Sequence, residues 1–178
     1  MMWYDWMCLG IVAAGAVVQA IRAGKVGGMG LPLFEACGVI CAGVGATKLY
    51  EPLGLALGLG NNKWVMLIIL FVVFSVLGFL LARWLFSVLA WTFESMDALF
   101  GFFWGIALGW VVANVVLRVI IEAQGGASGA VGAIVLGPEE ARAQAPIANE
   151  IMNFRTWNAI MRLLFKAKLG PDFNPDVG

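Results

Sequence analysis

The stretch WVMLIILFVVFSVLGFLLA, from Trp64 to Ala82, contains nineteen consecutive uncharged residues, and the apolar run continues past Arg83 to Phe93. A helix of about 20 apolar residues is long enough to cross the hydrocarbon core of a bilayer, which is about 30 Å thick. As one helix, residues 64–93 would extend about 45 Å. We therefore predict a tilted or protruding membrane span here, with Arg83 reaching the headgroups or turned inward.

The composition of the whole chain agrees with a membrane location. Of its 178 residues, 62% are apolar and 12% are charged, whereas soluble domains have about 45–50% apolar and about 25% charged residues. The length allows one domain of about four spans with a modest tail. These proportions predict an integral membrane protein and exclude an ordinary soluble domain.

Three further stretches have the length and polarity of spans. Residues 6–21 are uncharged and follow the aromatic interface anchors Trp3 and Tyr4. Because no basic residue precedes this stretch, we expect it to be retained rather than cleaved as a signal peptide. The other two are 26–47, a glycine-rich span that we expect Pro32 and Glu35 to interrupt and Lys48 to Pro52 to close, and 98–117, bounded by Asp97 and Arg118.

Together these stretches predict an all-α fold, an integral membrane four-helix bundle over residues 1–122 with both chain ends on the same side. Residues 123–146 are rich in glycine and alanine, and we expect a flexible connection there, a short fifth apolar excursion being the alternative. Residues 147–178 carry apolar side chains at helical spacing among basic ones, and Gly170 and Pro171 end the pattern. This predicts a basic amphipathic helix that lies in the membrane interface, or that packs on the bundle or on a second subunit.

Charge and residue types exclude several classes of function. Eleven basic residues offset eleven acidic ones, so no basic field exists to bind nucleic acid. The chain has no histidine, and its three cysteines lie in apolar stretches, so we predict neither a metal site nor a cofactor. Cys37 and Cys41 are four residues apart and are interpreted as small packing residues rather than a redox pair. No catalytic motif is present, and we predict that the protein is not an enzyme.

The most specific local pattern is GFFWGIALG, in which Gly101, Gly105 and Gly109 recur every four residues. Such a stripe lets another helix approach closely, which favours association inside a bilayer. We predict a helix-packing face. Its partner is either another helix of the same chain or the fourth span of a second subunit, which would make a homo-oligomer.

Charged residues in or near a membrane are functional candidates because their burial is costly. The candidates here are Asp5, Arg22, Glu35, Arg83 and Asp97. With four spans, an ion pair of Arg22 with Glu35 or of Arg83 with Asp97 is geometrically open, whereas Asp5 and Arg22 lie about 25 Å apart along one helix. Glu35 lies deepest, and we interpret it as a buried group with a partner or as a pore-lining carboxylate.

These patterns also resemble a known family. An opening M-x-W-x-D with Arg22 seventeen positions after Asp5, four spans in a short chain, and the sequence from Asp97 through Gly101 and Gly105 to Gly109 resemble the CvpA family of bacterial inner-membrane proteins, named for a role in colicin V production. The resemblance covers residues 1 to about 122. The chain departs from the family pattern at Ala23, where a glycine usually follows the arginine, and at Leu108, where many relatives have arginine.

The resemblance implies a multi-pass protein of the bacterial inner membrane, linked to toxin production or export and to envelope maintenance, with no catalytic residues. Its expected partners are the lipid bilayer, a second copy of the chain, and export or envelope proteins. The alternative function is a small channel or transporter subunit with a polar path near Glu35, Arg83 and Asp97.

Overall fold

The computed structural model describes residues 1–26, 28, 30–60, 62–89 and 96–154. Within these ranges the chain forms helices and no strands, so the predicted all-α class is confirmed. The long helices are α1 (Trp3–Val26), α2 (Gly30–Ala56), α3 (Lys63–Leu89) and α4 (Asp97–Ala123). All four are long and apolar enough to cross a membrane, which makes the chain a multi-pass membrane protein.

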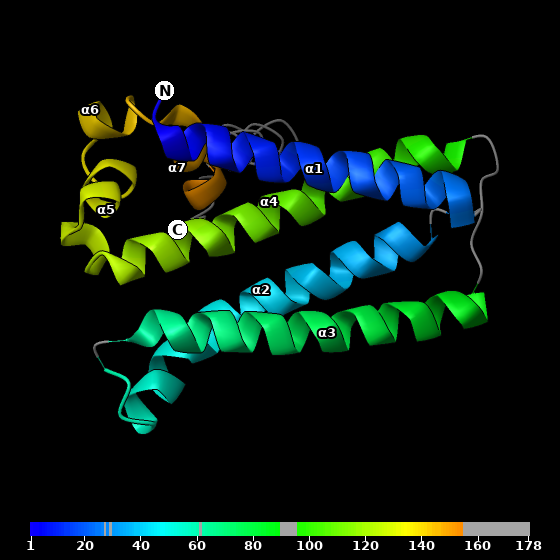
Figure 1. The fold of residues 1–178 in the computed structure, drawn as a ribbon, viewed down its shortest axis with the longest axis horizontal. Helices are drawn as coiled ribbons and strands as arrows, with labels where there is room; N and C mark the ends of the chain where they lie inside the picture. The colour runs from blue at the N-terminus through cyan, green and yellow to red at the C-terminus, as the bar shows by residue number, and fades with distance from the viewer. Residues whose placement is uncertain (27, 29, 61, 90–95, 155–178) are drawn as a thin grey trace, which may run out of the picture.

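The four helices are arranged as two closely packed pairs. Helix α1 packs mainly on α4, and α2 packs mainly on α3, while contacts between α2 and α4 join the pairs (Figure 1). Helices α1 and α3 end, and α2 and α4 begin, at one end of the bundle, whereas α2 ends and α3 begins at the other end, where the N-terminus lies (Figure 1). The pairing therefore joins the first span to the last, which sequence neighbourhood alone does not predict.

Glycines set the distance between α1 and α4. A Cβ atom placed on Gly105 would lie 2.6 Å from the Cα of Ala16, and one placed on Gly109 would lie 2.7 Å from the Cα of Val12. A Cβ on Gly101 would lie 2.7 Å from the carbonyl oxygen of Gln19. The predicted stripe is thus a packing face, and its partner is α1 of the same chain.

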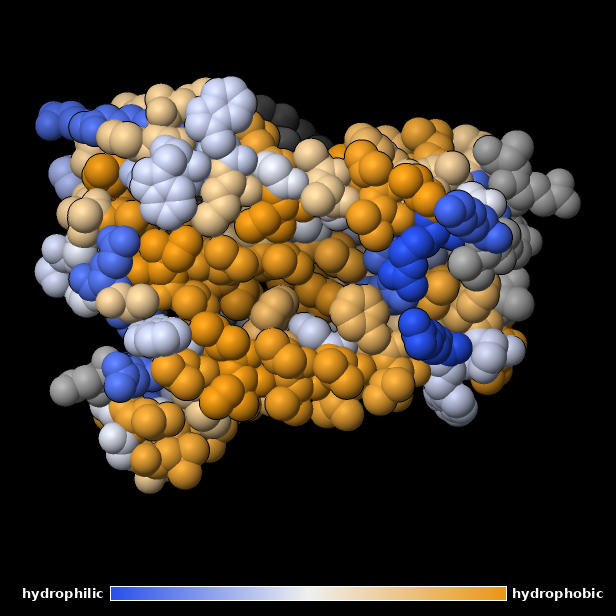
Figure 2. Space-filling view, in the orientation of Figure 1, coloured by the Kyte–Doolittle hydropathy of each residue, from blue (hydrophilic) through white to orange (hydrophobic). Residues whose placement is uncertain are grey.

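The second pair is held by an equivalent close approach. Gly38 of α2 and Gly78 of α3 face each other, and a Cβ on either would lie 3.0 Å from the backbone of the other. The rest of α3 turns large apolar side chains outward, including Val76 and Leu80, which are 53% and 58% exposed. Figure 2 shows the resulting apolar surface across the middle of the molecule, with hydrophilic residues toward the two ends. This surface is suited to contact with lipid acyl chains.

The structure differs from the prediction at both prolines of α2. Pro32 does not interrupt the span, because it lies in the first turn of α2, where no intrahelical bond requires its missing N–H group. Pro52 does not end the helix either, which continues to Ala56. Here an ion pair of 2.7 Å joins Glu51 to Lys63 at the start of α3, and Tyr50 donates a hydrogen bond to Glu122 of α4. These contacts join the turn just before the proline to α3 and α4.

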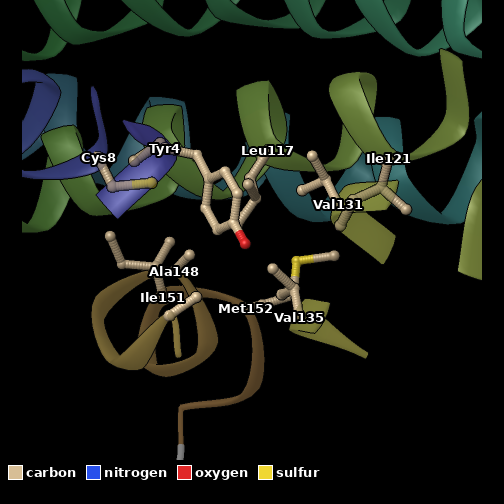
Figure 3. Packing of buried hydrophobic residues seen from close by; sticks show 11 residues of the cluster. Tyr4, Cys8, Leu117, Ile121, Val131, Val135, Ala148, Ile151 and Met152 are labelled. Carbon is tan, nitrogen blue, oxygen red and sulfur yellow. The ribbon is translucent and has the colours of Figure 1, made fainter. Parts of the chain in front are cut away.

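Residues 123–146, expected to form a flexible connection, instead carry short packed helices. These are η2 (Gly126–Ser128), α5 (Ala130–Val135) and α6 (Glu139–Arg142), followed by α7 (Pro146–Asn153). Val131 and Val135 are buried against Leu117 of α4, in a cluster that also contains Tyr4 and Ile151 (Figure 3). The low bulk of this segment permits tight turns, and its few branched side chains supply the contacts that fold it onto the bundle.

The amphipathic helix predicted for residues 147–178 is only partly described. Helix α7 ends at Asn153, because Phe154 adopts the left-handed conformation with φ of 49°, so no single helix runs on from Ile147. The buried side chains of α7, Ile151 among them, pack on the bundle. This agrees with the alternative placement of this face, not with a position in the membrane interface. Residues 155–178 lie outside the described residues, and the prediction of a basic helix there stays a prediction.

Candidate functional site

Glu35 lies at the centre of the most polar cluster inside the bundle. It occupies the second turn of α2 and is 1% exposed. Arg22, near the end of α1, pairs with it: Nη1 donates to Oε2 at 2.6 Å, and Nη2 donates to Oε1 at 2.7 Å. Gln19, one turn earlier in α1, donates through Nε2 to Oε2 at 2.7 Å. One of the two predicted ion pairs is therefore formed, and it is a bidentate one.

The antiparallel arrangement of α1 and α2 explains this geometry. Arg22 lies four residues before the end of α1, and Glu35 lies five residues after the start of α2, so both are at similar depth on facing helices. Gln19 and Arg22 are three residues apart and share one face of α1. A buried carboxylate is tolerated only when donors satisfy it, and these two side chains provide three.

Arg83 of α3 borders the same region. Together with Arg22, Glu35 and the apolar side chains Val76, Phe79 and Leu80, it lines a cavity of about 490 Å³. Arg83 is exposed, and no described residue forms an ion pair with it. The charges that the described residues place around this cavity are two arginines and one carboxylate, so their balance is positive. Its chemistry suits an anion with an apolar portion.

Asp5 and Asp97 are both buried, but they lie apart from this cavity. Asp97 is the first residue of α4 and is 2% exposed, where the helix dipole favours a negative charge. Asp5 is 0% exposed, and its carboxylate accepts hydrogen bonds from the backbone N–H groups of Met2 and Ala148, each at 2.9 Å. Ala148 lies in the first turn of α7, so Asp5 caps that helix from a distant part of the chain.

The five predicted polar candidates therefore divide into two sets. Arg22, Glu35 and Arg83 meet at the cavity, whereas Asp5 and Asp97 lie at helix ends. The predicted pair of Arg83 with Asp97 is not formed, because Arg83 makes no ion pair with any described residue.

Two polar residues were missed by the sequence analysis. Gln19 belongs to the Glu35 cluster, and it is the only carboxamide in the predicted span 6–21, which was the available signal. Asn114 is the corresponding residue of 98–117. Its Nδ2 donates to the carbonyl oxygen of Ile151 at 2.8 Å, and Arg118 donates to its Oδ1 at 3.1 Å. A side-chain carboxamide in a span is a candidate for a functional or structural role in the same way as a charged side chain, because its burial also requires hydrogen-bond partners.

The described residues contain no group of three His, Cys, Asp or Glu side chains that could hold a metal ion. Cys8 is buried, and Cys37 and Cys41 are exposed on α2 as free thiols. The two exposed cysteines border the groove between α2 and α3, next to Gly38.

Comparison of the chain with protein-family models, with curated proteins and with solved structures gave no match.

Proposed function

We propose that the chain is a non-enzymatic accessory protein of the bacterial inner membrane that resembles the CvpA family and supports toxin production or export and envelope maintenance. The proposal is supported by the positions, in the structure, of the residues on which the resemblance is based. Four of the six residues behind the resemblance, Asp5, Gly101, Gly105 and Gly109, contribute to the packing of α1, α4 and α7. Residues that shape a scaffold, rather than a reaction centre, are what an accessory protein requires.

A genetic experiment tests this role. In a bacterium that carries the gene and secretes a peptide toxin, deletion should reduce toxin release and increase sensitivity to detergents. A plasmid copy of the wild type, or of Gly10→Ala, should restore both properties, because a Cβ on Gly10 has nothing within 4 Å. Gly105→Leu should not restore them, because its side chain would separate α4 from α1. Deletion without effect on either property would contradict the proposal.

The buried charge cluster favours a second candidate, a small channel or transporter subunit. Glu35 is held by Arg22 and Gln19 beside a cavity that Arg83 also lines, and intramembrane ionisable residues commonly mark substrate or ion pathways. Purified protein reconstituted in liposomes distinguishes the two functions. Ion or solute flux that Glu35→Ala abolishes and Glu51→Ala leaves unchanged would favour the channel. The accessory role predicts no flux for the wild type.

A further inference from the structure

The ion pair with Glu35 does not use all the hydrogen-bond donors of the Arg22 guanidinium group. It has five N–H donors, and Glu35 accepts from Nη1 and Nη2. The Arg22 side chain is 34% exposed, whereas the carboxylate that it satisfies is 1% exposed. Glu35 thus fixes the orientation of Arg22, and the remaining donors are free to bind a second acceptor beside it.

Arg83 supplies a second cation to the lining of the cavity. It lies on α3 and has no ion-pair partner among the described residues, as noted above, while Glu35 is already neutralised by Arg22. An anion that enters the cavity therefore meets one net positive charge. Two arginines from different helices also suit a phosphate group, since guanidinium groups bind phosphate through parallel N–H···O bonds.

The position of the cavity along the helices indicates where the anion comes from. Arg22 lies four residues from the end of α1, Glu35 five residues from the start of α2, and Arg83 six residues from the end of α3. At 1.5 Å per residue these are depths of about 6 to 9 Å below the helix ends. Since helices of about 40 Å extend beyond a hydrocarbon core of about 30 Å, the charges lie near the headgroup level rather than at the bilayer centre.

The remaining wall of the cavity is apolar. Val76, Phe79 and Leu80 lie along α3 on the side of Arg83 that leads toward the middle of the helix. Val76 and Leu80 are more than half exposed, so this wall opens onto the outer surface of α3. A free phosphate ion would leave the wall uncovered. A ligand with an acyl chain attached to its phosphate would cover it.

We propose that this cavity is a binding site for an anionic phospholipid, with the phosphate between Arg22 and Arg83 and an acyl chain along Val76, Phe79 and Leu80. Basic pockets between membrane helices are suited to such headgroups. A zwitterionic lipid fits less well, because its quaternary ammonium group would face two arginines. The inference does not depend on the accessory role, since a channel subunit could hold the same lipid.

Native mass spectrometry of the purified full-length protein tests the proposal with phosphatidylglycerol, phosphatidylcholine and inorganic phosphate as separate probes. We expect one phosphatidylglycerol to be retained with an affinity about tenfold higher than that of phosphatidylcholine. Arg83→Gln removes a charge-assisted contact and should reduce the affinity for phosphatidylglycerol about tenfold. The fold should survive this change because Arg83 is exposed and forms no ion pair with the described residues.

Two further variants separate the parts of the site. Lys48→Gln removes an exposed cation near the other end of α2 and should leave phosphatidylglycerol binding within twofold of the wild type. Leu80→Trp should reduce lipid binding through the apolar wall without changing the low affinity for inorganic phosphate. Equal retention of the two lipids, or equal effects of Arg83→Gln and Lys48→Gln, would overturn the proposal. Phosphate binding that Arg83→Gln weakens, without preference for phosphatidylglycerol, would overturn the assignment of a lipid.

Discussion

Glu35 is a charged group in a mostly apolar bundle, and three donors from α1 hold it there. An ion pair of this kind contributes little compared with a well-packed apolar pair, but removing one partner leaves a buried charge uncompensated. The cluster is therefore better understood as a device that fixes the register of α1 against α2 and orients Arg22. The effect of the cluster on the free energy of unfolding should be measurable only when one partner of the ion pair is removed.

This argument predicts that Arg22→Met reduces the free energy of unfolding by about 3 kcal/mol, because Glu35 keeps only the bond from Gln19. The double variant Arg22→Met/Glu35→Leu should recover most of the loss, since no charge then remains buried. Denaturant titration in detergent micelles measures both. Lys63→Met breaks the exposed pair with Glu51 and should leave the unfolding transition in place. Equal losses for Arg22→Met and Lys63→Met would refute the role assigned to burial.

Asp5 caps a helix that is distant from it in the sequence. Its carboxylate accepts from the N–H group of Ala148, and α7 has no side-chain cap of its own at its N-terminus. Loss of a helix cap costs about 1 kcal/mol, or about fivefold in a local opening equilibrium. Asp5→Ala should therefore speed amide hydrogen exchange in α7 about fivefold. Asp5→Asn should have a smaller effect because one acceptor oxygen remains.

The amides of α3 are the internal control in the same exchange experiment, because α3 makes no described contact with Asp5. Faster exchange confined to the segment around α7 is the expected pattern. Unchanged exchange in α7 for Asp5→Ala would mean that apolar packing by Ile151 and its neighbours, rather than the cap, keeps α7 on the bundle.

At the scale of the helix pair, the distance between α1 and α4 depends on backbone contacts that any side chain would prevent. Hydrophobicity cannot drive helix association in lipid, because the acyl chains are as apolar as the side chains. Close packing can do so, and it requires a stripe of small residues on one helix facing small residues on the other. Gly15 and Ala16 of α1 provide the matching surface for Gly105.

We predict that Gly105→Ala reduces the free energy of unfolding by about 1–3 kcal/mol through overpacking, and that Gly105→Leu has a larger effect. The matched control is Gly10→Ala on α1, where a Cβ has nothing within 4 Å. That variant should be unchanged or slightly more stable, because alanine has the higher helix propensity. If both alanine variants unfold at the same denaturant concentration, close contact at Gly105 does not stabilise the pair.

The helices and the stripe could be predicted from sequence because each is a local pattern. A run such as Trp64–Ala82 or a four-residue glycine period is complete within one segment. The partner of the stripe could not be predicted, because Gly105 looks the same whether it faces Gly15 or a second subunit. The pair of Arg22 with Glu35 was accessible because only a short turn separates α1 from α2.

Non-local contacts explain what the sequence analysis predicted incorrectly. The helices within 123–146 depend on contacts such as Val131 with the α4 side chains of the cluster, and the glycine content of the segment alone suggested flexibility. Likewise, the bond from Ala148 to Asp5 joins residues at opposite ends of the chain. Neither the burial of Asp5 nor its partner could be predicted from the sequence, because both depend on where α7 packs.

At the scale of the whole molecule, the two helix pairs meet through α2 and α4, where Val115 packs on Ala46 and Leu67. The stripe on α4 is already covered by α1, so self-association of the chain would require another surface, such as the outer face of α3. The cavity between Arg22, Glu35 and Arg83 lies where α1, α2 and α3 converge. It therefore depends on the alternating direction of the four helices across the bilayer.

That alternation is the central claim, and cysteine labelling in sealed membrane vesicles tests it most directly. In a chain whose three native cysteines are replaced by alanine, single cysteines are introduced by Lys25→Cys, Gly60→Cys, Met96→Cys and Ser128→Cys, all at exposed positions near helix ends. A membrane-impermeant maleimide should label the variants at 25 and 96 from one side, and those at 60 and 128 from the other. Labelling of all four from the same side would contradict a bundle of four membrane-crossing helices.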